Sequence, residues 1–264
     1  MQSTTEVLKR FQLFNIVLAV VLVIFTVFIA KGYMGMWWLP LPLFIHLSIF
    51  FLGAVNIRWN FFLTSLFKGK NPKYISLTFD DGPAAFTNDI LDILQQQNVK
   101  ATFFTIGKHA AKYPAVVKRW HNEGHTIGNH SYTHGFNFDW QSSNKMAEEI
   151  EHTNRVIGEL TGQVPNLFRP PYGITNPNLG RAVANTNMLS IGWTLRSFDT
   201  KAKDPEKLLA DMLGKLQGGD IILLHDSMAI TVKILTSLIV QAKQMGYTFV
   251  PVNELLEIAP YKKP

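Results

Sequence analysis

An uncharged apolar run near the start of the chain constrains the fold more than any other feature. It extends from Phe11 to Ala30, and as a helix its twenty residues would span about 30 Å, the thickness of a bilayer's hydrocarbon core. A second apolar run extends from Met36 to Ile57 and contains two prolines and one histidine. We therefore expect residues 1–70 to form a membrane anchor, a helical hairpin with these two runs as its spans, followed by a globular domain over residues 71–264.

Each run has an alternative. A cleaved signal peptide could replace the first span, but the run is too long and no small-x-small cleavage site follows it. The prolines of the second run, with Trp37 and Trp38, also suit a helix that is only partly inserted.

Basic residues flank the outer ends of the hairpin, and only Lys31 lies between the runs; they are Lys9, Arg10, Arg58, Lys68, Lys70 and Lys73. If both runs span, the positive-inside rule places the domain in the cytoplasm. If only the first run spans, the domain lies outside the cell. The expected location is thus a membrane, with the bilayer as a partner.

Charge and cysteine content limit which partners and which metal ligands the chain can have. The net charge is +6, but residues 1–70 hold six basic residues and one acidic residue, whereas the rest of the chain holds 19 basic and 18 acidic residues. The globular part is nearly neutral and carries no basic stripe, which argues against nucleic acid as a partner. The chain has no cysteine, so any metal site must use His, Asp or Glu.

From Lys73 onward, short apolar runs alternate with amphipathic stretches. This alternation predicts a parallel sheet with helices between its strands, and the number of repeats favours a (β/α) barrel of about seven parallel strands over an open sheet. The predicted strands are Tyr74–Phe79, Ala101–Ile106, Thr126–Asn129, Leu167–Arg169, Met188–Trp193, Asp220–His225 and Tyr247–Val250.

Polar residues follow most of these strands, at the end of a parallel barrel where reactive groups gather. They are Asp80, Asp81, His130, His134, Arg169, Asp199 and His225. The segment "HSYTH" supplies two imidazoles four residues apart, which on a helical turn would face one metal ion, and a carboxylate would complete three ligands with a position left for water. Zinc is the expected metal, and Fe(II), Co(II) and Ni(II) also suit these ligands.

The two aspartates of "TFDDGP" are expected to act separately, since successive residues of an extended chain point to opposite sides. One carboxylate would bind the metal, and its neighbour would accept a proton from water. Arg169 is the candidate to keep the second carboxylate ionised and oriented.

Four segments, in order, are similar to the motifs of the carbohydrate esterase family 4 polysaccharide deacetylases, the NodB-homology domain. They are "TFDDGP" at 78–83, "HSYTH" at 130–134, "RPPYG" at 169–173 and "ILLHD" at 222–226. The resemblance spans roughly Lys73 to Val252. It implies a metal-dependent N-deacetylase on a distorted (β/α) barrel.

The resemblance also implies a role for each residue. Asp80 would be the general base, held by Arg169, and His225 the general acid. Asp81, His130 and His134 would bind the metal, and the backbone N–H of Tyr172 would stabilise the oxyanion. One segment departs from the family pattern: in "WTLRSFDT", Asp199 matches the acid that bonds the catalytic histidine, but Arg196 replaces a common aspartate and Thr200 replaces a tryptophan.

A final feature is the alternation of Phe136, Phe138 and Trp140 after the second histidine. This segment is either an apolar platform for a sugar ring or lipid near the cleft, or a loop packed against a neighbouring helix.

The function that these observations favour is hydrolysis of N-acetyl groups on amino sugars. The substrate would be peptidoglycan or another envelope glycan if the domain faces outward, and a lipid-linked amino sugar if it faces the cytoplasm. Two alternatives stay open. A non-heme Fe(II) oxygenase would use the same two histidines and one carboxylate, and an inactive module would only bind glycan.

Overall fold

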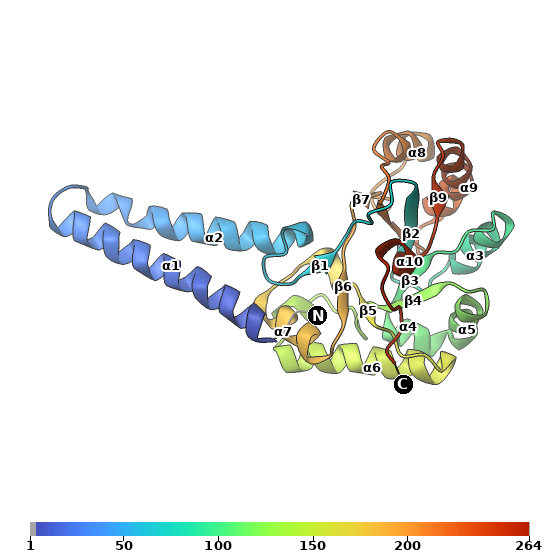
Figure 1. Ribbon diagram of the computed structural model, residues 1–264, viewed down its shortest axis with the longest axis horizontal. Coiled ribbons are helices and arrows are strands. Elements are labelled where there is room, and N and C mark those ends of the chain that lie inside the picture. Colours follow the sequence, from blue (N-terminus) through green and yellow to red (C-terminus); the bar gives the residue numbers. More distant parts are fainter. Residues whose placement is uncertain (1–3, 264) are drawn as a thin grey trace.

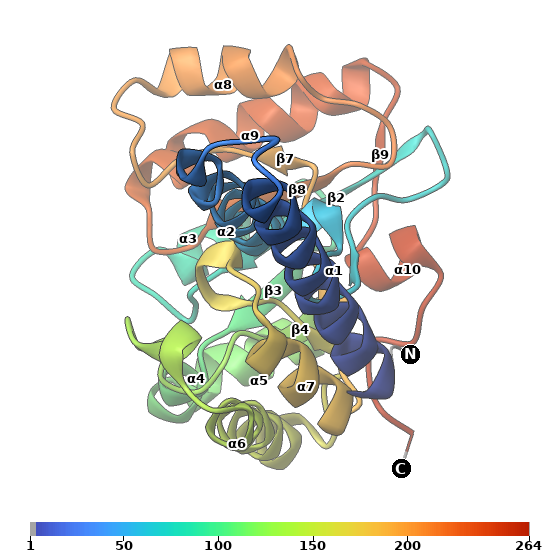
Figure 2. The ribbon, with the colours of Figure 1, turned by 90° about the vertical axis from the view of Figure 1, so that its left-hand side faces the viewer.

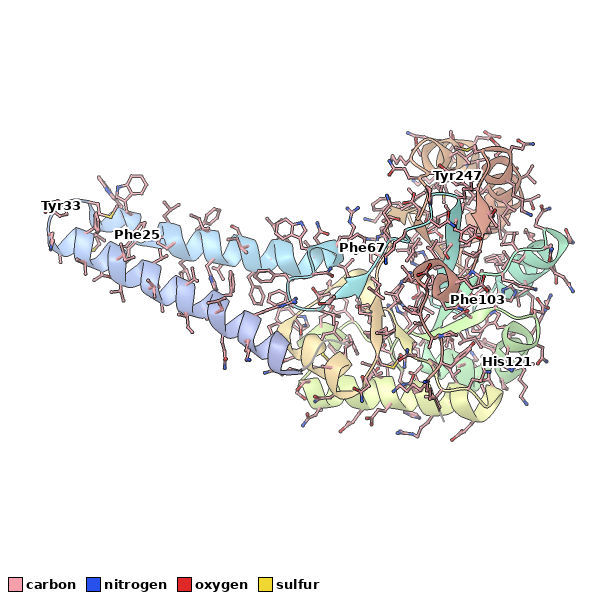
Figure 3. The ribbon with its side chains drawn as sticks, in the orientation of Figure 1. Phe25, Tyr33, Phe67, Phe103, His121 and Tyr247 are labelled. Atoms are coloured by element: carbon pink, nitrogen blue, oxygen red, sulfur yellow. The ribbon has the colours of Figure 1, made fainter. Side chains whose placement is uncertain are left out.

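The computed structural model describes residues 4–263 and consists of a long helical hairpin that projects from a globular domain (Figure 1). Tyr33 lies at the far tip of the hairpin and Phe103 lies deep in the domain (Figure 3). The hairpin and the domain therefore occupy opposite ends of the molecule, as the sequence indicates.

Two helices form the hairpin: α1 (Thr4–Ala30) and α2 (Pro40–Val55), with the short 3-10 helix η1 (Met36–Trp38) between them. Pro40 begins α2 at a first-turn position, where its missing N–H costs no hydrogen bond. Within these helices, Lys9–Ala30 and Met36–Val55 are long and apolar enough to cross a membrane. Most of their large apolar side chains are exposed, as expected of side chains that face lipid.

All paired strands of the nine-stranded sheet are parallel, which confirms the predicted barrel class. The strands are β1 (Ser65–Leu66), β2 (Tyr74–Asp80), β3 (Thr102–Thr105), β4 (Thr126–Asn129), β5 (Leu167–Phe168), β6 (Leu189–Ile191), β7 (Leu195–Arg196), β8 (Ile221–His225) and β9 (Thr248–Phe249). Their order is β1-β6-β5-β4-β3-β2-β8-β7, with β9 beside β2. The chain passes directly from β6 at one side of this order to β7 at the other, so the sheet must curl into a barrel.

Helices surround the barrel, as Figure 2 shows in a view from the side of the hairpin. They are α3 (Thr87–Gln96), α4 (Gly107–Lys112), α5 (Pro114–Asn122), α6 (Ser143–Thr161), α7 (Pro177–Asn185), α8 (Pro205–Leu213), α9 (Ala229–Gln244) and α10 (Val252–Leu256). Three short 3-10 helices lie in the connections: η2 (Ile57–Trp59), η3 (Phe138–Trp140) and η4 (Pro171–Gly173).

Strand β2 shows how the sequence separates the two faces of the sheet. Its apolar side chains, Ile75, Leu77 and Phe79, join the main core between the barrel and the helices. The ring of Phe79 stacks on Phe103 at 5.1 Å, and Phe103 stacks on Trp120 of α5 at 4.7 Å. After the exposed Tyr74, the alternate residues Ser76, Thr78 and Asp80 are polar and buried, so β2 contributes a row of polar groups to the barrel interior.

Two of the observed strands were absent from the sequence-based prediction. β1 pairs with β6 and β7 pairs with β8, but each is only two residues long. β1 lies on the N-terminal side of the boundary expected between residues 70 and 71, and Leu63 just before it is buried in the domain. The segment that leaves the hairpin therefore already contributes to the sheet.

Candidate active site

The backbone turns sharply at the two adjacent aspartates at the end of β2. Asp80 is the last residue of β2 and is buried, while Asp81 has φ 74 and is half-buried. The expectation of an extended chain at Asp81 was therefore wrong, and both carboxylates lie near Nε2 of His130: Oδ1 of Asp81 at 3.5 Å and Oδ2 of Asp80 at 3.9 Å. Gly82 allows the turn, because a Cβ there would lie 2.1 Å from Oδ2 of buried Asp226.

The two histidines come from an irregular loop after β4, not from the helical turn that their spacing suggested. Ser131 and His134 both have positive φ, 62 and 50, which folds the loop back on itself. Glu149 of α6 fixes the loop by accepting hydrogen bonds from the backbone N–H groups of Tyr132 (3.0 Å) and Thr133 (2.8 Å).

These elements bring Asp81, His130 and His134 together. Oδ1 of Asp81 lies 3.5 Å from Nε2 of His130 and 3.5 Å from Nε2 of His134. One ligand atom from each residue lies within 4.8 Å of the others. Two ligands of a tetrahedral ion, each at about 2.1 Å, are separated by about 3.4 Å, so the donor atoms fit a single divalent cation.

Hydrogen bonds and charges prepare this cluster for a cation. Nδ1 of His130 donates to the carbonyl oxygen of Arg169 at 2.7 Å, which leaves Nε2 free to act as a ligand. Burial is the largest cause that lowers the pKa of His134, to about 4, which favours its neutral form. Burial would raise the pKa of the Asp81 carboxyl, but the nearby histidines lower it well below its usual range, so Asp81 is ionised.

Asp80 is held by Arg169 through Oδ1, while its Oδ2 lies 3.9 Å from Nε2 of His130. The guanidinium is fully buried, and its Nη1 donates to Oδ1 of Asp80 and to Oγ1 of Thr78, both at 2.7 Å. It also stacks over the ring of Phe104 at 4.1 Å. Removing either charge of such a buried pair would leave the other uncompensated, and the two hydrogen bonds of Nη1 fix the orientation of the Asp80 carboxylate.

His225 lies at the end of β8, directly across from Asp80 in the register of β2 and β8. Its Nδ1 bonds to Oδ1 of Asp199 at 2.8 Å, and its backbone N–H donates to Oδ2 of Asp199 at 2.7 Å. The hydroxyl of Thr231 donates to the same Oδ2 at 2.8 Å. Asp199 is fully buried and therefore orients His225 through a fixed, well-satisfied carboxylate.

Tyr172 lies in η4, after β5, with the left-handed backbone angles φ 56 and ψ -3. Its hydroxyl donates to the carbonyl oxygen of His134 at 3.3 Å, and the two rings are 4.6 Å apart. One residue that departs from the family pattern, the exposed Arg196, lies over the rings of Trp193 (5.8 Å) and Phe198 (5.1 Å).

The aromatic segment after His134 combines the two alternatives that its sequence suggested. Phe138 is fully buried against Leu63 and Met146, as expected of a packed loop. Phe136 and Trp140 are 90% and 88% exposed. Packing of Phe138 therefore holds two neighbouring aromatic rings out in solvent.

Sequence reasoning brought together the candidate residues but missed the residues that position them. Glu149 accepts a hydrogen bond from the backbone of the histidine loop, Thr231 donates one to Asp199, and Thr78 accepts one from Arg169. No local pattern marks Glu149 or Thr231, because each looks like an ordinary polar residue of a helix. The position of Thr78 on the polar face of β2, two residues before Asp80, was the one available signal.

Comparisons with known proteins give a consistent result. Residues 67–191 match the family model described as polysaccharide deacetylase. A peptidoglycan-N-acetylglucosamine deacetylase of Bacillus cereus is 35% identical over 198 residues, which cover 73% of this chain and 72% of that protein. Its counterpart PgdA of Listeria monocytogenes is 35% identical over 189 residues, but these cover only 40% of that longer protein.

A solved structure agrees with these sequence matches. The crystal structure of the Bc1960 peptidoglycan N-acetylglucosamine deacetylase superposes with a TM-score of 0.73 at 34% identity, covering 78% of this chain and 98% of that one. The family-model match begins at residue 67, after the hairpin, so this match rests on the domain that carries the candidate site.

Proposed function

The chain belongs to the polysaccharide deacetylase family, and from this premise we propose that it is a membrane-anchored, metal-dependent N-deacetylase of envelope amino sugars. The reaction would hydrolyse an acetamide to acetate and a free amine. One observation carries the proposal: the Asp81–His130–His134 cluster shares the rim of the barrel with two buried ion pairs, Asp80–Arg169 and Asp199–His225.

The metal would be held by Asp81, His130 and His134, with zinc as the expected ion. Such an ion would polarise the acetyl carbonyl and lower the pKa of water toward about 7. The ligand set itself also suits Fe(II), Co(II) and Ni(II), so metal analysis of protein purified without added ions identifies the native metal.

The remaining steps belong to the protein's own side chains. Asp80, ionised and oriented by Arg169, would accept a proton from the attacking water. The backbone N–H of Tyr172 would donate to the developing oxyanion, a contribution of roughly 3 kcal/mol for such donors. His225 would protonate the departing nitrogen, which leaves very poorly as an amide anion, and Asp199 would keep His225 charged.

Residues 1–70 would anchor the enzyme through the hairpin, with residues 71–264 as the catalytic domain. The two apolar helices support this division. Tethering favours a substrate in the cell envelope, either a glycan polymer or an amino sugar on a lipid.

Acetate release from N-acetylglucosamine oligomers and from peptidoglycan, measured without oxygen, tests the proposal. We expect turnover by the wild type, and Asp80→Asn and His225→Ala should retain the metal while losing a factor of roughly 10²–10⁴ in rate. Oxygen-dependent product formation would instead indicate an oxygenase. Glycan binding without acetate release would indicate an inactive binding module.

A further inference from the structure

We propose that the catalytic cleft opens at the bilayer surface and that its substrate is an N-acetylated amino sugar attached to a membrane lipid. This inference rests on the proposed deacetylase function and narrows it to one substrate class. Phe136 and Trp140 would enter the interfacial layer of the bilayer beside the mouth of the cleft.

The first observation is a direct link between the candidate span α2 and a loop of the active-site rim. The backbone N–H of Thr175 donates to the carbonyl oxygen of Ala54 at 2.8 Å, and its hydroxyl donates to that of Gly53 at 3.2 Å. Carbonyls in the last turn of a helix have no partner within the helix, so Thr175 completes the end of α2. Thr175 comes just after η4, which contains Tyr172, so the rim is fixed to the domain end of the span.

The second observation is that the segment carrying the exposed Phe136 and Trp140 is hydrogen-bonded to residues that directly follow Thr175. Nδ2 of Asn176 donates to the carbonyl oxygen of Asp139 at 2.9 Å, and Nδ2 of Asn178 donates to that of Gln141 at 3.0 Å. These bonds hold the segment containing Trp140 against the start of α7. Helix α7 in turn contacts α1, and the two lie side by side in Figure 2.

The level of the membrane follows from the residues at the base of the hairpin. Trp59, which is 52% exposed, ends the short helix η2 that follows α2, and Nη1 of Arg10 donates to the carbonyl oxygen of Asn60 at 3.1 Å. Tryptophan and arginine next to the end of a span are typical of the interface between hydrocarbon and water. The Asn176 and Asn178 bonds place the aromatic segment beside this level.

Exposure of the aromatic pair to water is otherwise costly. Transfer of a large apolar side chain out of water is worth about 1.5–3 kcal/mol, and aromatic residues are favoured in the interfacial layer. Because buried Phe138 fixes the segment, Phe136 and Trp140 cannot turn inward without disrupting the core. The bilayer that holds the hairpin is the apolar surface within reach of both rings.

A cleft at this level would meet sugars that are carried by lipids in the same membrane. A polymer chain farther from the bilayer would have to bend down to the mouth of the cleft. The geometry therefore favours a lipid-linked amino sugar over a polymeric glycan.

The test compares two substrates with the full-length, metal-loaded enzyme in vesicles of phosphatidylethanolamine and phosphatidylglycerol. One is a soluble N-acetylglucosamine oligomer, and the other is the same sugar attached to a long-chain lipid in the vesicle. We expect the double variant Phe136→Ser/Trp140→Ser to lower kcat/KM for the lipid-linked sugar at least tenfold more than for the soluble one. Met245→Ser serves as the matched control and should leave the ratio unchanged, because Met245 is 52% exposed and caps α9, a helix that lies away from the hairpin (Figure 1).

The results separate the two proposals. Equal effects of the double variant on both substrates would overturn the inference and leave the deacetylase intact. Absence of acetate from every N-acetylated substrate would instead overturn the proposed function. A second measurement does not need turnover: brominated lipids should quench the fluorescence of wild-type protein more than that of Trp140→Phe, and equal quenching would also overturn the inference.

Discussion

At the scale of single residues, Asp199 determines the protonation of His225. Burial by itself would lower the pKa of His225, but the hydrogen bond and charge of Asp199 raise it above its ordinary value. A general acid must carry its proton before it can donate it. In the proposed mechanism, Asp199 would therefore extend toward alkaline pH the range in which His225 could protonate a leaving amine.

Substitution Asp199→Asn removes the negative charge and should lower the pKa of His225. Because His225 must be protonated to act, the alkaline limb of the profile of kcat/KM against pH is expected to move to lower pH. Thr231→Val is the matched control: it removes one hydrogen bond to Asp199 but keeps the carboxylate, so its shift should be smaller. An alkaline limb that stays in place in Asp199→Asn would argue against His225 as the acid.

At the scale of elements, the short rim segment η4 depends on one glycine. Gly173 has φ 72, and a Cβ on it would lie 2.2 Å from Cη2 of Trp193. Gly162, after α6, has the same φ of 72, but nothing lies within 4 Å of its Cβ position. Comparing substitutions at Gly173 and Gly162 therefore separates the loss of stability caused by a left-handed backbone from the loss caused by a steric clash.

Gly173→Ala should accordingly be more harmful than Gly162→Ala. Both variants carry about 1–2 kcal/mol of backbone strain, and the clash at Gly173 should add about 1–3 kcal/mol. We expect Gly173→Ala to lower Tm by several degrees more and to reduce kcat/KM, since the Tyr172 N–H would move. Thermal unfolding and acetate release, measured in the same detergent, test both effects. Identical Tm values for the two variants would show that the Trp193 side chain can move aside without any loss of stability.

The same scale explains how far the sequence predicts the fold. Strand β4 was predicted with its observed bounds and β2 to within one residue, because both are apolar or β-branched runs that end at recognisable turns. β1 and β7 were missed, since two residues are too few for a period to appear. They exist because their backbone groups complete the hydrogen bonding of β6 and β8, a requirement of the assembled sheet.

Prediction of the site shows a similar division. The order of Asp, His, Arg and His at strand ends was visible in the sequence, and the parallel topology brings these residues to one rim. The local geometry was not visible: positive φ at Asp81 and His134 sets the directions of both side chains. Such angles are stabilised by distant groups, such as Glu149 on α6, whose partners depend on the tertiary fold.

At the scale of the whole molecule, direct contacts attach the domain to the base of the hairpin. The side of the membrane on which the domain lies therefore decides which substrates the cleft can meet. Hydrogen bonds from Thr175 to the end of α2 leave little freedom for the domain to turn away from its anchor. The side on which residue 263 lies therefore also fixes the side on which the cleft lies.

Cysteine labelling determines this side, because the chain contains no cysteine of its own. If both helices span, the basic residues at the base of the hairpin, Lys9, Arg10 and Arg58, place the domain in the cytoplasm. A membrane-impermeant maleimide should then label Lys263→Cys only after the cells are permeabilised. Tyr33→Cys, at the 72% exposed tip between the helices, should be labelled in intact cells. Labelling of both variants in intact cells would show that only α1 crosses the membrane, and labelling of Lys263→Cys alone would show that the hairpin is inverted.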